Sequence, residues 1–423
     1  MHALDVAVIG CGSAGPGAAV LLQRAGHRVT VFEAVPALGA VGAGVLLQPT
    51  GLEVLARIGV LEAILMHGAP VARLHCRTRS GATILDLPYG ELGAGVRGVG
   101  IHRAVLLHYL VEAMREAAIP VRLGTPITEI APAGPTASLL RDAAGGEHGP
   151  FGLVVVADGA RSALRSRLPV RARVRPYPWG ALWFIGRDPE QRFGGRLSQI
   201  VHGARHMIGL LPTGLDIERT APLVSLFFSV RLTDIDTVRR AGIGAWRDGV
   251  RALAPEAEPI LAQIDSFEQL ATAAYLDVRM RPWHAGHVLL LGDAAHATSP
   301  QLGQGVNLAL RDAACLADCL ADASDVPAAL AEYTRRRKHH LAYYQLASRW
   351  LTPFFQSSSR VLGWIRDIGF ATVTRFASMR RKMIRTMAGV ERGVIRPGLA
   401  VPAVPMLPPG ASDPPPSEIR LSD

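Results

Sequence analysis

The chain has 423 residues, of which 49% are hydrophobic and 19% are charged. This length exceeds what one hydrophobic core usually supports, and the composition excludes both a small disulfide-stapled scaffold and a wholly disordered chain. The four cysteines show neither CxxC pairing nor the Cys/His spacing of a zinc site, and no apolar run is long enough to span a bilayer. We therefore expect at least two packed domains, no bound metal and a reduced, cytoplasmic setting.

The net charge of +10 is concentrated in one part of the chain. Residues 331–397 contain 14 Lys and Arg against three acidic residues, so the remainder is close to neutral. No nucleic-acid reader motif or interleaved aromatic stripe accompanies this charge. The pattern therefore argues against nucleic acid as a partner.

The first residues alternate in the way that builds a parallel sheet. A strand at 6–9 is followed by a glycine turn, a helix at 15–25 and a second strand at 28–32. A Rossmann-type unit therefore opens the chain.

Later segments continue this unit. Residues 102–117 have the spacing of an amphipathic helix, and a long helix is expected at 305–320. Residues 153–157 and 287–291 are short apolar runs without polar alternation, which is typical of strands buried on both faces.

Two regions between these segments are richer in aromatic residues, turns and alternating strands, such as those at 179–185 and 223–230. We interpret them as one domain inserted twice into the nucleotide-binding domain. The predicted fold is α/β: a Rossmann-type domain, an interleaved mixed or antiparallel-sheet domain for the substrate, and C-terminal helices. The expected boundaries are 1–70, 100–170 and 279–345 for the first domain, 71–99 and 171–278 for the second, 346–396 for a helical segment, and 397–423 for a Pro-rich, disordered tail.

Residues 10–15 read Gly-Cys-Gly-Ser-Ala-Gly, and Glu33 ends the next strand, 23 residues after Gly10. In such a turn Gly10 permits the tight bend, Gly12 lets the backbone approach a pyrophosphate, and Gly15 lets the helix pack closely on the strand. The helix N-terminus offers free N–H groups to phosphates, and Glu33 can accept hydrogen bonds from a ribose. This first motif predicts dinucleotide binding.

Two more motifs each follow a buried apolar run. Residues 157–165 read Ala-Asp-Gly-Ala-Arg-Ser-Ala-Leu-Arg, and residues 291–296 read Leu-Gly-Asp-Ala-Ala-His, followed by Pro300, Gly303, Gly305 and Asn307. In order and spacing, the three motifs resemble those of the single-component (class A) flavoprotein monooxygenases with the para-hydroxybenzoate hydroxylase fold, notably the 2-polyprenyl-6-methoxyphenol hydroxylase type. The resemblance covers roughly residues 5–350.

The resemblance implies non-covalent FAD as the cofactor. In the family the first motif holds the ADP part, the Asp-Gly motif supports the pyrophosphate region, and the Gly-Asp motif holds the ribityl chain. By this likeness Asp293 accepts hydrogen bonds from ribityl hydroxyls, Arg103 reaches the FAD from the start of a helix, and Pro300 lies against the isoalloxazine ring. The residues expected to bind the cofactor are Gly10, Gly12, Ser13, Ala14, Gly15, Glu33, Ala34, Arg103, Ile127, Asp158, Gly159, Asp293, Pro300, Gly303, Gln304, Gly305, Val306 and Asn307.

In the same family NAD(P)H reduces FAD, and a flavin C4a-hydroperoxide formed with O₂ transfers oxygen to an electron-rich carbon. The resemblance thus implies an enzyme that hydroxylates a small hydrophobic, aromatic or polyketide-like compound, with NAD(P)H and O₂ as co-substrates. We expect the substrate between the flavin and the inserted sheet, in a pocket that includes Trp183, Phe184, Phe227 and Pro300. The sequence identifies no catalytic base, and His296 is expected to have a structural role.

Other readings of the same motifs stay open. A flavin halogenase lacks support, because residues 179–183 read Trp-Gly-Ala-Leu-Trp without the halogenase signature and no lysine precedes Lys338. An FAD-dependent reductase, dehydrogenase or epoxidase acting on a hydrophobic substrate would bind FAD through the same three motifs. A non-catalytic flavin-binding protein associated with a membrane is the alternative from another class.

The basic segment 341–394 combines apolar residues at helical spacing with a cluster formed by Arg380, Arg381, Lys382 and Arg385. We expect it to pack on the main body, and peripheral contact with an anionic membrane is the second interpretation. The substrate, the choice between NADH and NADPH, and the oligomeric state cannot be read from these patterns.

Overall fold

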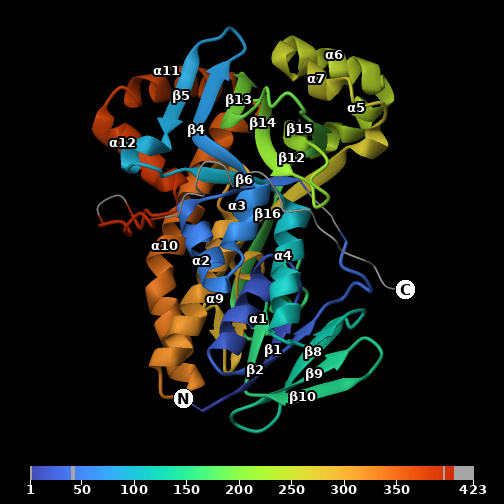
Figure 1. Ribbon diagram of the computed structural model, residues 1–423, viewed down its shortest axis with the longest axis vertical. Helices are drawn as coiled ribbons and strands as arrows, with labels where there is room; N and C mark the ends of the chain where they lie inside the picture. The colour runs from blue at the N-terminus through green and yellow to red at the C-terminus, as the bar shows by residue number, and fades with distance from the viewer. Residues whose placement is uncertain (1, 40–42, 394–395, 404–423) are drawn as a thin grey trace.

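The computed structural model describes residues 2–39, 43–393 and 396–403 (Figure 1). Two lobes are stacked along the long axis of the molecule, and the long helix α10 (Val326–Phe355) runs beside the lower lobe toward the upper one (Figure 1). The predicted α/β class is confirmed. The segment 404–423, which makes up most of the predicted Pro-rich tail, lies outside the described residues.

The lower lobe is built on a six-stranded sheet with the order β17-β18-β11-β1-β2-β7. Neighbouring strands from β18 to β7 run parallel, as a Rossmann-type domain requires. Every residue of β11 and β18 is buried, which explains their unbroken apolar sequences. The strands are β1 (Asp5–Ile9), β2 (Arg28–Phe32), β7 (Val121–Arg122), β11 (Leu153–Val156), β17 (His284–Ala285) and β18 (Val288–Leu290).

Helices of the lower lobe pack on this sheet and on one another. The first helix contacts β1 and β2 and lies against both α4 and α9. Gly17 permits the close approach, because a Cβ there would lie 3.2 Å from the side chain of Leu310. The helices are α1 (Ala14–Arg24), α2 (Pro49–Ile58), α3 (Leu61–His67), α4 (Arg103–Glu116), α8 (Asp293–His296) and α9 (Gly305–Asp322).

A three-stranded antiparallel sheet is inserted between β7 and β11. It has the order β10-β9-β8, with β8 (Ile127–Pro132), β9 (Ser138–Asp142) and β10 (Glu147–Phe151). The ring of Phe151 packs edge-on against Phe32, with centroids 5.9 Å apart, which attaches this small sheet to the parallel one. The sequence had not predicted these strands.

The upper lobe contains a nine-stranded mixed sheet with the order β16-β12-β15-β14-β13-β4-β6-β3, and β5 pairs with β4. The pairings are antiparallel except between β4 and β13, which run parallel. Its strands are β3 (Gly44–Leu47), β4 (Ala69–Thr78), β5 (Thr83–Pro88), β6 (Gly98–His102), β12 (Arg171–Arg187), β13 (Gly195–His202), β14 (His206–Leu215), β15 (Pro222–Arg231) and β16 (Ala271–Arg281). The chain thus enters this lobe three times, at β3, at β4–β6 and at β12–β16. The predicted interleaving is confirmed, whereas the domain boundaries stay a prediction.

Three helices cover the outer face of the large sheet: α5 (Ile235–Ala241), α6 (Ile243–Leu253) and α7 (Glu258–Leu261) (Figure 1). Trp246, Val250 and Ile260 from these elements form one core with Leu182, Leu226 and Ile208 of the strands. The opposite face of the sheet contributes residues such as Val201 and Met207 to a second core, which is continuous with the core of the lower lobe. One face of the sheet is therefore turned toward the nucleotide-binding domain.

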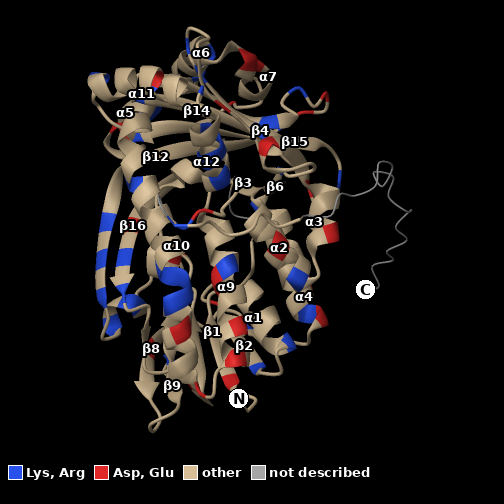
Figure 2. Cartoon of the chain, turned by 90° about the vertical axis from the view of Figure 1, so that its left-hand side faces the viewer, with Lys and Arg blue, Asp and Glu red and all other residues tan. Residues whose placement is uncertain are grey.

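The basic C-terminal segment folds as the end of α10, α11 (Arg360–Val373) and α12 (Ala377–Met387), and α12 carries much of its positive charge (Figure 2). Part of this charge is neutralised within the protein. Arg380 pairs with Glu91 at 2.6 Å, while Lys382 and Arg385 both pair with the buried Glu391, at 3.1 and 2.6 Å. Among the described residues, no helix combines the length and apolar character needed to cross a membrane.

Candidate active site

The glycine turn has the geometry that its sequence predicts. Gly10 has φ +104°, and a Cβ there would lie 2.5 Å from the carbonyl oxygen of Ala157. A Cβ at Gly15 would overlap the carbonyl oxygen of Gly10, so this glycine allows α1 to pack on β1. A Cβ at Gly12 would meet no atom within 4 Å, so the backbone is open on that side.

Helix α1 follows this turn, and its N-terminus has no side-chain cap. Ser13 occupies the capping position but makes no side-chain hydrogen bond to the helix, which begins at Ala14. The first N–H groups of α1 are thus available to an anion.

Glu33 lies beside the same turn. Its Oε2 accepts a hydrogen bond from the N–H of Cys11 at 2.6 Å, and its Oε1 accepts one from the N–H of Val35 at 3.1 Å. Ala34 follows it and is exposed. Burial raises the pKa of the Cys11 thiol to about 12, so this cysteine is a small protonated side chain.

The Asp-Gly motif follows β11 at the edge of the sheet where β1 also ends. Desolvation raises the pKa of Asp158, and its Oδ1 is buried without a hydrogen-bond partner among the described residues. Gly159 has φ +86° and open space where a side chain would lie. Arg165, which is buried, donates from Nη1 to the carbonyl oxygen of Ala294 at 2.8 Å and from Nη2 to that of Ala160 at 3.0 Å. Arg165 thereby joins the second motif to the third.

Asp293 begins α8, directly after the Gly292 turn. Its carboxylate is accessible to solvent, yet desolvation by the surrounding protein raises its pKa, against the opposing charges of His296 and Arg103. This combination is expected of a carboxylate on the floor of a deep cleft. A Cβ at Gly305 would lie 3.8 Å from Asp293 Oδ1, so the start of α9 faces the same carboxylate.

A buried charge network supports the Gly-Asp turn from behind. Asp312 Oδ2 accepts hydrogen bonds from the N–H of Gly292 at 3.0 Å and from His296 Nε2 at 2.5 Å. Asp312 Oδ1 accepts from Arg337 Nε at 2.7 Å. His296 is therefore structural, as expected, whereas the roles of Asp312 and Arg337 carry no local sequence signal.

The network continues to the C-terminal segment. Arg337 Nη1 lies 2.7 Å from His340 Nδ1, and His340 Nε2 lies 2.8 Å from the carbonyl oxygen of Gly389. Since Arg337 can only donate, His340 accepts at Nδ1 and donates from Nε2. Burial and the charge of Arg337 lower the pKa of His340 well below its ordinary value, which keeps the ring neutral.

The turn before α9 is built from Pro300, which is exposed, and Gly303, which has φ +59° and open space on its Cβ side. Gln304 is buried and donates from Nε2 to the carbonyl oxygen of Met387 at 2.7 Å, while Val306 packs on the core. Asn307 is also buried. Its Oδ1 accepts from the N–H of Gln48 at 2.8 Å and its Nδ2 donates to the carbonyl oxygen of Leu46 at 3.0 Å.

These contacts occupy the side-chain amide of Asn307, and the role of Asn307 in cofactor binding stays a prediction. Its amide holds the start of α9 to the chain between β3 and α2, and Gly51 must lack a side chain to make room for it. Two other expected residues lie at the margins of the cradle. Arg103 is exposed at the first position of α4, and Ile127 is half-buried at the start of β8.

The expected substrate residues divide between the two faces of the large sheet. Trp183 and Phe227 are direct neighbours on β12 and β15, and their ring centroids are 5.2 Å apart. Phe227 packs on the core that is continuous between the two lobes, so this pair lies on the sheet face opposite to α5–α7. Phe184 packs on the opposite core beneath α5–α7, because adjacent residues of a strand point to opposite faces. The expectation that Phe184 lines the substrate pocket is therefore wrong.

Tyr275 of β16 joins the aromatic pair. Its hydroxyl oxygen lies 3.2 Å from Trp183 Nε1, which donates to it, and burial raises the pKa of Tyr275 to about 12. Farther along the same strand, the N–H of Val278 donates to the carbonyl oxygen of Ala297 at 2.9 Å. The strand that carries Tyr275 thus reaches the turn that leads to Pro300. The sequence had not singled out Tyr275.

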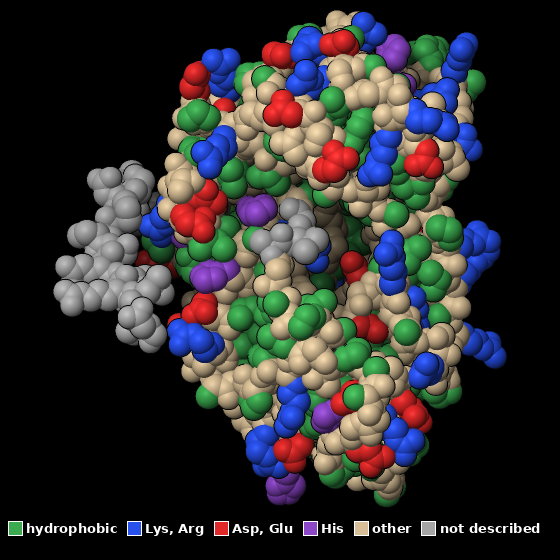
Figure 3. Space-filling model, turned by 90° about the vertical axis from the view of Figure 1, so that its right-hand side faces the viewer, with side chains coloured by type: hydrophobic (Ala, Val, Ile, Leu, Met, Phe, Trp, Pro, Cys, Tyr) green, Lys and Arg blue, Asp and Glu red, His purple; other side chains and the backbone are tan. Residues whose placement is uncertain are grey.

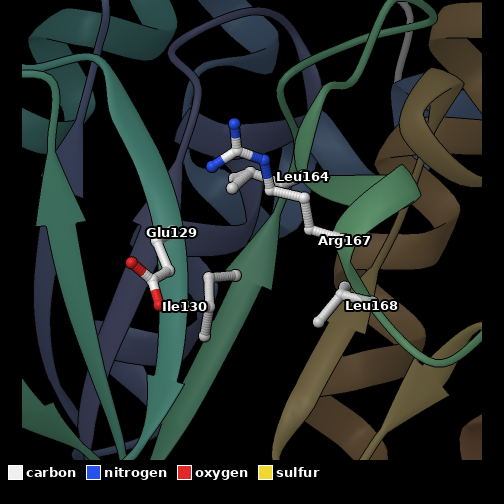
Figure 4. A pocket seen from close by; sticks show the side chains of 5 residues that line it. All are labelled: Glu129, Ile130, Leu164, Arg167 and Leu168. Atoms are coloured by element: carbon white, nitrogen blue, oxygen red, sulfur yellow. The ribbon is translucent and has the colours of Figure 1, made fainter.

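A separate cavity of about 290 Å³ lies between β8 and the 3₁₀ turn Leu164–Arg167 (Figure 4). It is lined by Glu129, Ile130, Leu164, Arg167 and Leu168. None of these residues belongs to the aromatic face or to the Gly-Asp turn. Another hollow lies between the two lobes, on the face of the molecule that Figure 3 shows.

The described residues fit FAD in several respects. Gly12, Gly159 and Gly303 leave the backbone open where the three motifs meet. Helices α1 and α9 both begin without a side-chain cap, so their N–H groups can face phosphate and flavin oxygens. Within the parts of the chain that the structure describes, no cluster of His, Cys, Asp or Glu could hold a metal ion.

Comparisons with known proteins agree with this fit. A sequence model of the family described as "FAD binding domain" matches residues 3–344. The 3-amino-4-hydroxybenzoate 2-monooxygenase of Streptomyces cremeus is 31% identical over 333 residues, which cover 75% of this chain and 78% of the relative. A putative 2-heptyl-3-hydroxy-4(1H)-quinolone synthase of Rhodococcus erythropolis is 27% identical over 353 residues, covering 81% and 86% of the two chains. The crystal structure of Klebsiella pneumoniae HpxO complexed with FAD and uric acid has a TM-score of 0.77 at 23% identity and covers 91% of this chain and 97% of that one.

The fold and the three-motif cradle define a flavoprotein. The chain belongs to the FAD-binding domain family. It is an FAD-dependent monooxygenase with the para-hydroxybenzoate hydroxylase fold. The narrower 2-polyprenyl-6-methoxyphenol hydroxylase type stays a prediction.

Proposed function

We propose that this monooxygenase hydroxylates a small planar aromatic compound bound between the aromatic face of the large sheet and the turn at Pro300. The observation that carries the proposal is the Trp183–Phe227 pair, which lies on the sheet face turned toward the cofactor domain. Ring faces prefer offset or tilted contacts with other rings, and this pair is itself tilted by 41°. A flat substrate ring is the ligand that such a surface favours.

Bound FAD supplies the oxygen-transfer chemistry, with NAD(P)H and O₂ as co-substrates. The residues of this chain hold it in place. Asp293 would accept hydrogen bonds from the ribityl hydroxyls, and the N-terminus of α9 at Gly305 would stabilise negative charge on the flavin ring. Pro300 would lie beside the flavin and close one side of the substrate space.

Tyr275 orients the substrate. Its oxygen already accepts a hydrogen bond from Trp183, and its raised pKa keeps the hydroxyl protonated near neutral pH. The hydroxyl proton is therefore available to a substrate oxygen or nitrogen. A ring that bears such a heteroatom is both recognised by Tyr275 and rich enough in electrons to accept oxygen. The names of two relatives support this class. One name contains 3-amino-4-hydroxybenzoate, and the other contains a hydroxyquinolone.

The decisive experiment measures NAD(P)H oxidation by the purified holoenzyme with a panel of hydroxylated and aminated aromatic compounds. The expected result is oxidation stimulated by one class of ring, with a product heavier by one oxygen atom that carries ¹⁸O from ¹⁸O₂. Label arriving from water, or reduced and dehydrogenated products without added oxygen, would replace this proposal with the reductase or dehydrogenase interpretation.

A further inference from the structure

The C-terminal helices expose an unusual amount of apolar surface. Thirteen large hydrophobic side chains are exposed in the described part of the chain, and eight of them lie between residues 346 and 379. We name these eight the apolar patch: Leu346, Trp350, Val361, Trp364, Ile365, Ile368, Phe376 and Met379. Single exposed apolar residues need no explanation, whereas a cluster of this kind marks an interaction surface.

Helix α11 is buried on one side and exposes apolar residues on the opposite side. Its inner side presents Gly363, Arg366 and Phe370, all buried. Its outer side presents Val361, Trp364, Ile365 and Ile368 at the i, i+3, i+4, i+7 spacing of one helical face, with Trp364 67% exposed. Such an exposed apolar face is typical of a helix that contacts a second apolar environment.

The orientation of α11 is fixed by specific contacts on its inner side. Arg366 Nη1 donates to the carbonyl oxygens of Gly203 at 3.0 Å and Phe354 at 3.1 Å, and its guanidinium pairs with Asp367. A Cβ at Gly363 would lie 2.9 Å from the backbone nitrogen of Ala204. The helix therefore cannot rotate to bury its outer face without breaking a buried hydrogen-bond network.

The unpaired charges beside the apolar patch are arginines. Arg360, Arg375 and Arg381 are exposed beside it, and none forms an ion pair in the described part of the chain, in contrast to Arg380, Lys382 and Arg385. The single acidic residue between 357 and 381 is Asp367, which is already paired with Arg366. The surface thus combines an apolar face with unneutralised arginines.

We infer that the apolar patch docks this enzyme on the surface of an anionic lipid bilayer. A twofold contact with a second copy would gather the arginines of both chains around one apolar face without carboxylates to pair them. An anionic lipid surface neutralises all three, and tryptophan and arginine are the residues that favour the headgroup region. Trp364, one of the two exposed tryptophans among the described residues, lies on the outer face of α11, whereas the other, Trp350, contacts Phe354 and Phe370.

The test is co-sedimentation of the full-length holoenzyme with vesicles of phosphatidylcholine alone and of phosphatidylcholine and phosphatidylglycerol in equal parts. The expected result is binding to the mixed vesicles, weakened by added salt, with little binding to the neutral ones. The double variant Trp364→Ser/Ile368→Ser should reduce partitioning at least about tenfold. Each of Arg360→Gln and Arg375→Gln should reduce it about fivefold.

Matched controls are Ile217→Ser and Arg231→Gln, which alter an exposed apolar residue and an exposed arginine away from the patch. All variants should keep the FAD content and the NAD(P)H oxidation rate of the parent, which separates lost docking from misfolding. The inference is overturned if the parent does not bind mixed vesicles, or if it binds neutral ones equally well. It is also overturned if sedimentation velocity shows a dimer that Trp364→Ser/Ile368→Ser converts to a monomer while vesicle binding is absent.

Discussion

Arg337 and Asp312 form an ion pair, 2.7 Å between Nε and Oδ1, in which both side chains are buried. Burial alone would raise the pKa of Asp312, but the charges of His296 and Arg337 hold it well below its usual range. A carboxylate whose pKa is lowered by folding contributes stability above its unfolded pKa and loses it as the pH falls through the folded pKa. The pair therefore supports the Gly-Asp turn at neutral pH and fails only in strong acid.

Replacing Asp312 should show how much the cradle depends on this pair. Asp312→Ala leaves Arg337 buried without a counter-charge, so we expect a loss of about 3–5 kcal/mol in the free energy of unfolding together with FAD-poor protein. Urea denaturation and the flavin-to-protein absorbance ratio measure the two effects. Glu112→Ala, which removes an exposed ion pair with Arg115, is the control and should change neither appreciably. Equal behaviour of the two variants would contradict the role given to Asp312.

Two glycines of the same turn should respond differently to the same change. Gly15→Ala places a Cβ onto the carbonyl oxygen of Gly10, so α1 must shift, and we expect a loss of about 1–3 kcal/mol or more in apoprotein stability. Gly12→Ala meets no protein atom within 4 Å and should leave apoprotein stability nearly unchanged while weakening FAD binding. Thermal denaturation of the apoproteins and titration with FAD separate the two. Comparable destabilisation by both substitutions would show that Gly12 is a packing residue.

Asp293 should make FAD affinity depend on pH. Asp293→Ala removes hydrogen bonds worth about 0.5–1.5 kcal/mol each, so the affinity should fall roughly tenfold. Since the pKa of Asp293 is raised, its carboxylate is protonated at a higher pH than an ordinary aspartate, and FAD should bind progressively less tightly as the solution is acidified. Asp293→Asn has no titrating group at this position, so its FAD affinity should not fall with decreasing pH in this way. Fluorescence titration of the apoprotein with FAD at several acidic pH values measures this dependence. If Asp293→Asn shows the same pH dependence as the parent, another residue is responsible.

Tyr275→Phe should impair substrate binding without affecting the cofactor. One lost hydrogen bond of about 0.5–1.5 kcal/mol corresponds to roughly a 2-fold to 10-fold rise in KM, with FAD content unchanged. Tyr109→Phe is the matched control, because its hydroxyl contacts His67 at 3.2 Å on another element. Steady-state NAD(P)H oxidation with the best substrate of the panel provides the measurement. An unaltered KM in Tyr275→Phe would remove this hydroxyl from the substrate site.

The sequence predicted the parts of the site that depend on neighbouring residues. The glycine turn, the Asp-Gly motif and the Gly-Asp motif follow from local sterics, so Gly10, Gly15 and Gly292 occupy the positions that their spacing requires. Trp183 and Phe184 are adjacent on one strand, and strand alternation alone predicts that they point to opposite faces of the sheet.

The remaining features arise from contacts between distant segments. Asp312 and Arg337 lie on separate helices, and the sequence around each residue does not indicate that the two form a pair. The pairing of β3 with β6 and the position of Tyr275 on the cofactor side of the sheet are likewise set by long-range packing. Such contacts depend on how whole elements meet, which a local pattern does not encode.

The contacts of Met387 and Gly389 bear on when the enzyme acquires its cofactor. Gln304 donates to the carbonyl of Met387, His340 to that of Gly389, and Gly389 lies so close to Thr50 that a side chain there would collide with the Thr50 hydroxyl. During synthesis the glycine turn leaves the ribosome first, and these closing residues leave it more than three hundred residues later. The growing chain therefore has an incomplete cradle until almost all of the described chain has been made. We therefore expect FAD to be captured by the finished polypeptide and not by the growing chain.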